Sequence, residues 1–146
     1  MNKTRLASWL GVLVALPGLA LAGAPAGITA QNAWVRYLLP NLPAGAYLTL
    51  KNTGDTPAML TGARSPACST LMLHQSMDSS GTAMMMGVSA IPIPAHGTLA
   101  LSEGGYHLMC MDPKMRVGGQ APLTLEFQDG STLPLNVQVY GPSGPP

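Results

Sequence analysis

The sequence predicts an all-β fold, a single antiparallel β-sandwich. Helical periodicity is weak after residue 23, and Gly and Pro interrupt the chain every few residues. Between these interruptions lie short runs rich in β-forming residues that alternate between apolar and polar side chains. Many short strands with regular turn signals are typical of sandwiches.

The chain of 146 residues is long enough for one domain. Its start has the plan of a secretory signal peptide, with Lys3 and Arg5, an apolar run from Leu6 to Leu21, and small residues around Ala22. A membrane anchor is the alternative, although the run is short for a bilayer span. We expect a signal peptide at 1–22, a domain at 23–140, a disordered tail at 141–146 and a periplasmic location.

Nine strands are expected, in the order Ile28–Tyr37, Ala46–Asn52, Pro57–Arg64, Thr70–Gln75, Met84–Ile93, Gly97–Leu101, Tyr106–Met111, Leu123–Phe127 and Thr132–Val139. Asp129-Gly130 predicts a hairpin between the last two, and Pro134 predicts that the last is an edge strand. The expected core is mainly aliphatic: Trp34, Tyr47, Leu48, Leu50, Leu71, Leu73, Leu108, Leu123, Leu125, Phe127, Leu135 and Val137.

Charge excludes some classes of function. Without Lys3 and Arg5, five basic residues face six acidic ones, so the mature net charge is −1. No basic patch is left to bind nucleic acid. Paired carboxylates and nucleophile–base sets are also missing from the sequence pattern, so we expect no enzyme.

Methionine and histidine gather in one window. The nine methionines after Met1 lie between Met59 and Met115, and His74, His96 and His107 fall in the same window. Methionine is often adaptable core filler, but filler would be scattered along the chain. The coincidence favours a site, with His96 left in a solvent-exposed turn.

The candidate ligands are His74, Met85, His107 and Met109. In a regular strand, His107 and Met109 share one face and Cys110 the other. A polar turn after His74 would bring it back toward the run Met84–Met86. Met77, Met84, Met86 and Met111 are additional candidates, with packing as their alternative role.

The residue types point to Cu(I). Thioether sulfur is a soft, neutral donor that selects Cu(I), and imidazole also binds copper. Zinc sites use Cys, His and carboxylate, and calcium and magnesium prefer oxygen. Affinity should weaken as pH falls through the histidine range, because only neutral imidazole binds the ion.

Two cysteines, Cys68 and Cys110, are an even pair that can form a disulfide in an oxidising compartment. A redox-active or copper-contacting thiol pair is the alternative.

The spacing of His74, Met85, His107 and Met109 matches the pattern His-x10-Met-x21-His-x-Met of the periplasmic copper chaperone family PCu(A)C. Residues Ala33–Arg36, Ala46–Gly54, Ile93–Gly97, Gly104–Met109 and Leu125–Gly130 also resemble that family. The resemblance covers about residues 28–140. It implies a cupredoxin-like (immunoglobulin-like) sandwich, an exposed Cu(I) site and no catalysis. It also implies delivery of copper toward the binuclear centre of cytochrome c oxidase, with the oxidase copper subunit or a Sco-type protein as partner.

The run Met84-Met85-Met86 departs from the family, which often has basic residues there, so the binding methionine stays open. Copper tolerance or storage and a copper redox enzyme remain alternative functions. We expect a monomer that meets a membrane only through its partner.

Overall fold

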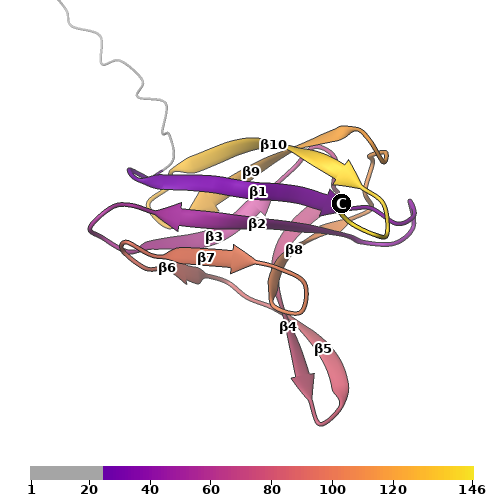
Figure 1. Cartoon of the computed structure of the whole chain (residues 1–146), viewed down its shortest axis with the longest axis horizontal. Helices are drawn as coiled ribbons and strands as arrows, with labels where there is room; N and C mark the ends of the chain where they lie inside the picture. The colour runs from indigo at the N-terminus through magenta and orange to yellow at the C-terminus, as the bar shows by residue number, and fades with distance from the viewer. Residues whose placement is uncertain (1–24) are drawn as a thin grey trace, which may run out of the picture.

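A computed structural model describes residues 25–146 of the protein; the expected signal peptide, residues 1–22, lies outside the described residues. Residues 25–146 form ten strands and no helix (Figure 1): β1 (Ile28–Arg36), β2 (Ala44–Asn52), β3 (Ala58–Arg64), β4 (Thr70–Ser79), β5 (Thr82–Gly87), β6 (Ile91–Ile93), β7 (Thr98–Leu101), β8 (Tyr106–Met111), β9 (Gln120–Phe127) and β10 (Thr132–Tyr140). Within this part of the chain, no helix is long and apolar enough to cross a bilayer.

The strands form one hydrogen-bonded sheet that closes over a single core. Their order is β5-β4-β8-β2-β1-β10-β9-β3-β6, with β7 paired to β2. Leu48, Leu73 and Leu108 from one half of this order and Leu125 and Ile93 from the other belong to one cluster of buried residues. The two halves therefore pack face to face, and the predicted β-sandwich is confirmed.

The prediction that the last strand is an edge strand is wrong. β10 is an interior strand, because it pairs with β9 along its length and in parallel with β1 at Gln138–Tyr140. Pro134 is tolerated because the pairing with β1 begins only at Gln138, so the missing N–H of proline breaks no bond to β1. The same pair makes the sheet mixed rather than purely antiparallel.

The expected strand Met84–Ile93 is two strands. β5 pairs with β4, whereas β6 pairs with β3 at the other end of the sheet order. The chain between Gly87 and Ile91 must cross from one half of the sandwich to the other, so it leaves the extended ladder there.

The β4–β5 hairpin extends away from the body of the sandwich (Figure 1). Its loop is Ser80-Gly81, with φ of 54° and 81°, and Ser79 lies opposite Thr82. Two positive φ values in a two-residue loop are the type I′ geometry. This turn sets the register of the hairpin and places Ser76 opposite Met85.

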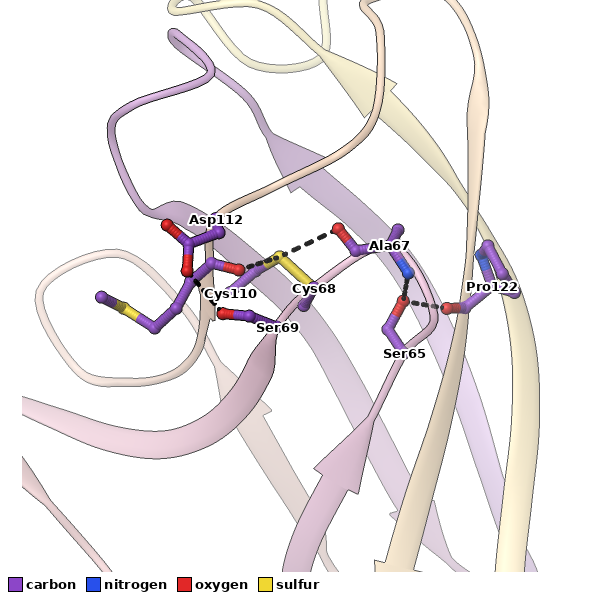
Figure 2. Close-up of a disulfide and its surroundings, with 8 residues drawn as sticks. Ser65, Ala67, Cys68, Ser69, Cys110, Asp112 and Pro122 are labelled. Atoms are coloured by element: carbon purple, nitrogen blue, oxygen red, sulfur yellow. Dashed lines mark hydrogen bonds between the residues drawn. A yellow bond between two sulfur atoms is a disulfide. The ribbon is translucent and has the colours of Figure 1, made fainter.

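Cys68 and Cys110 form a disulfide at the end of β8 (Figure 2). Cys110 is 1% exposed and belongs to the core, and the bridge joins β8 to the segment just before β4. Beside it, the Ser69 hydroxyl donates to Asp112 at 2.7 Å. The disulfide therefore ties the start of β4 to the end of β8, the two strands that carry the histidines.

The C-terminal residues, expected to be disordered, have a defined course. The Gly144 N–H donates to the Gly141 carbonyl at 3.0 Å. Gly144 also lies so close to the indole of Trp34 that an added Cβ would stand 3.0 Å from the ring. The absence of a side chain at Gly144 lets the tail pack there.

Candidate metal centre

The candidate ligands come together on one face of the β4–β8 pair. His107 and Met109 alternate with Leu108 and Cys110, which are buried in the core. His74 is the Cα partner of His107. Directly opposite residues in an antiparallel pair point to the same side, so the two histidines share the face that is turned away from the core.

The two imidazoles are close neighbours. Their ring centroids are 5.8 Å apart, with the planes at 70°. The Nδ1 atom of His74 is buried and has no hydrogen-bond partner among the described residues. Burial lowers the pKa of His74, and the neighbouring His107 lowers it further. His74 therefore stays neutral, with a lone pair to offer, to a lower pH than a free imidazole.

His107 is fixed by the backbone. Its side chain is 5% exposed, and its Nδ1 lies 3.2 Å from the Gly105 carbonyl. A carbonyl oxygen can only accept, so Nδ1 carries the proton and Nε2 is free to bind a metal. This arrangement is typical of metal-binding histidines, in which one ring nitrogen is held and the other coordinates.

Met85 and Met109 line a cavity of about 510 Å³ together with His107. The register of the hairpin pairs Met85 with Ser76, two positions from His74, so Met85 points to the same face as the histidines. Met84 and Met86 point to the other face, as does Met77, the Cα partner of Met84. Met111 shares the face of Met109 but does not line the cavity.

His74 borders this cavity without lining it. Instead it lines a neighbouring hollow of about 430 Å³ with Met72 and Gly87. The structure thus gathers Met85, His107 and Met109 around one space and sets His74 against its wall, in edge contact with the His107 ring.

The cavity is also lined by Tyr47, Arg36 and Glu103, to which the sequence analysis gave no role in the site. Tyr47 packs 6.5 Å from His107 and 4.7 Å from Trp34, measured between ring centroids. The Arg36 guanidinium stacks over both aromatic rings and pairs with Glu103. Two features of the sequence could have placed these residues near the site. Alternation along the first strand puts Trp34 and Arg36 on one face, and Glu103 lies in the turn just before His107.

The remaining candidates lie elsewhere. Cys68 and Cys110 are joined on the core side of β8, away from the histidine face. His96 is exposed, as expected, and its Nε2 lies 2.7 Å from Asp55.

The donor set has a clear chemical character. In residues 25–146, no three His, Cys, Asp or Glu side chains gather as a metal-binding group. What gathers instead is two imidazoles and two thioethers, a neutral set that suits a soft monovalent ion. The unpartnered Nδ1 of His74 and the free Nε2 of His107 fit such an ion.

Comparison with known proteins identifies the family of this chain. The family model described as "Putative lipoprotein LpqE-like" matches residues 28–139. The chain belongs to this LpqE-like family. A "Putative lipoprotein Lxx21020" of Leifsonia xyli subsp. xyli is 39% identical over 121 residues, which are 81% of this chain and 72% of the relative.

Solved structures confirm the predicted resemblance to PCu(A)C proteins. A copper-bound PCuAC domain from PmoF2 is similar with a TM-score of 0.68 and 25% identity, over 82% of this chain and 97% of that domain. The Cu(I) form of DR1885 from Deinococcus radiodurans has a TM-score of 0.61 and 35% identity, over 84% of this chain and 83% of that protein. Apo-DR1885 matches 97% of each chain with 33% identity and a TM-score of 0.62.

Proposed function

We propose that this LpqE-like protein binds Cu(I) through His74, Met85, His107 and Met109. The observation that carries the proposal is the pairing of His74 with His107 on the face that also bears Met85 and Met109. Two soft thioethers and two neutral imidazoles favour Cu(I) over zinc or hard cations. The related PmoF2 domain and DR1885 have been solved with copper, which supports the same ligand here.

Binding requires one local adjustment. His74 turns from the neighbouring hollow toward the cavity that Met85, His107 and Met109 line. Rotation between staggered side-chain positions is enough, because His74 stands directly opposite His107 and its ring nitrogen makes no competing hydrogen bond among the described residues.

The ligands differ in exposure, and this suits a carrier. Met85 is 62% exposed, whereas His107 is 5% exposed. An acceptor's ligand can replace Met85 first while His107 still holds the ion, so copper never has to leave as a free ion. We therefore propose a carrier that transfers Cu(I) and performs no catalysis of its own.

We propose that the transfer takes place outside the cytoplasm, in the periplasm. The disulfide supports an oxidising compartment, and the relatives described as lipoproteins support export. The proposed acceptor is the copper subunit of cytochrome c oxidase or a Sco-type protein, with the protein acting as a monomer, without nucleic acid, and meeting a membrane only through that partner.

A competitive Cu(I) titration against a chromogenic chelator tests the site. The wild type should bind one ion tightly, and His107→Ala and Met109→Ala should each weaken that binding while the fold stays intact. Met115→Leu, which changes a methionine packed against the core, is the matched control and should leave the affinity unchanged. No competition by the wild type would refute the proposal.

A second assay tests transfer. Copper-loaded protein is mixed with the soluble copper domain of an oxidase subunit or with a Sco-type protein, and the copper in each is measured after separation. Transfer is expected to proceed faster than dissociation of copper into the chelator. Turnover of oxygen with a reductant would instead indicate a copper enzyme.

A further inference from the structure

The projecting β4–β5 hairpin has a second face, opposite the one that bears Met85. Met77 and Met84 are Cα partners across the hairpin, and Met86 follows Met84 by two positions. These three side chains therefore lie on one face of the hairpin. Their exposed fractions are 44%, 50% and 49%.

Core packing does not account for these three methionines. Their face continues the core side of β4, where Leu71 and Leu73 are buried. The hairpin, however, extends beyond the body, so the opposite half of the sandwich does not cover its tip (Figure 1). Three large apolar side chains thus stand together in solvent where a stable, soluble hairpin would ordinarily carry polar ones.

We propose that Met77, Met84 and Met86 form a second Cu(I) site, built of thioethers alone. Directly opposite Cβ atoms in a hairpin are about 5 Å apart and diagonal ones about 7–8 Å apart. The flexible methionine side chain, with three rotatable bonds, spans the remaining gap, so three sulfurs can meet at one ion.

The chemistry of this face selects a soft monovalent ion. The residue opposite Met86 is Gln75, a neutral amide. Asp78 directly follows Met77 in β4, so its side chain lies on the other face of the hairpin. Hard divalent cations therefore find no carboxylate in the cluster, whereas thioethers select Cu(I).

This second site differs from the histidine site in strength and position. It lacks imidazole and is open to water, so it should bind copper more weakly. It lies back to back with the histidine site, since Met85 alternates with Met84 and Met86 along β5. The hairpin can then take up an incoming ion while the histidine site is already loaded. The inference uses a separate set of donors and stands independently of the proposed function.

The test is a titration of the purified protein with Cu(I) under reducing conditions, repeated with redox-inert Ag(I), while the methyl signals of carbon-13-labelled methionine are followed. We expect two equivalents to bind. The methyl signal of Met109 should move with the first, and those of Met77, Met84 and Met86 should move together with the second.

The variant Met77→Leu/Met84→Leu/Met86→Leu is expected to lose the second equivalent and keep the first. Leucine preserves the volume of exposed side chains, so the unfolding transition should match the wild type. Met115→Leu is the control and should keep both equivalents. A wild type in which the methyl signals of Met77, Met84 and Met86 do not move at any copper equivalent, or a triple-leucine variant that binds as many equivalents as the wild type, would overturn the hairpin site.

The two sites can be tested separately. His107→Ala/Met109→Ala should lose the first equivalent and still show the joint movement of the three hairpin methyl signals. If the double variant binds as many equivalents of Cu(I) as the wild type, the histidine site is wrong. The hairpin site is then decided separately, by whether the methyl signals of Met77, Met84 and Met86 move together.

Discussion

The disulfide between Cys68 and Cys110 yields a stability prediction whose size follows from the structure. The two cysteines are 42 residues apart in sequence. In the chain-entropy account, closing a loop of that length in the unfolded state stabilises the native state by about 4 kcal/mol. Cys68→Ala/Cys110→Ala should therefore lower the free energy of unfolding by about 4 kcal/mol, a large share of the ~5–15 kcal/mol of a typical domain.

The assay is equilibrium unfolding in urea, followed by the fluorescence of Trp34, with and without a thiol reductant. The reductant should destabilise the wild type by a similar amount and leave the double variant unchanged. A loss below about 1 kcal/mol would refute the reasoning, since loop closure predicts several times more. Where it remains folded, the double variant should bind Cu(I) with wild-type affinity, because both sulfurs lie on the core side of β8.

The other predictions concern the site and the core. Met85→Leu should weaken Cu(I) binding on the order of tenfold or more, whereas Met84→Leu should leave the tight site unaffected; equal losses in chelator competition would contradict the assigned face. The pKa of His74, followed by NMR, should lie below the ordinary histidine value, and His107→Gln should raise it only in part, because burial is the larger cause. Since that folded pKa is lowered, the unfolded state binds the proton first, and the free energy of unfolding should fall as pH drops below about 6.5; urea titrations at higher and lower pH check this. Leu125→Ala, at a fully buried position, should cost about 3 kcal/mol in thermal unfolding, and a cost near zero would place Leu125 outside the core.

Much of the strand pattern could be predicted because it is local. Gly, Pro and alternation marked most of the strands, and Leu48, Leu108 and Leu125 are buried as expected. Tyr47 was expected in the core but packs beside His107, because it belongs to the face of β2 that bears Gly45, opposite Met109. Pro134 did not reveal that β10 is an interior strand. That position depends on the pairing of β10 with β1, which lies far away in the sequence.

By itself, the sequence determined that His107 and Met109 share a strand face and that Cys110 does not, because side chains alternate with a period of two in any strand. Only the tertiary structure decided that His74 lies opposite His107 and that Met85, rather than Met84 or Met86, turns toward them. A slip of one residue in the hairpin would exchange these methionines between faces. The type I′ turn at Ser80-Gly81 fixes the register of the hairpin locally. The pairing of β4 with β8, which sets His74 opposite His107, joins residues far apart in the chain and can be read only from the tertiary structure.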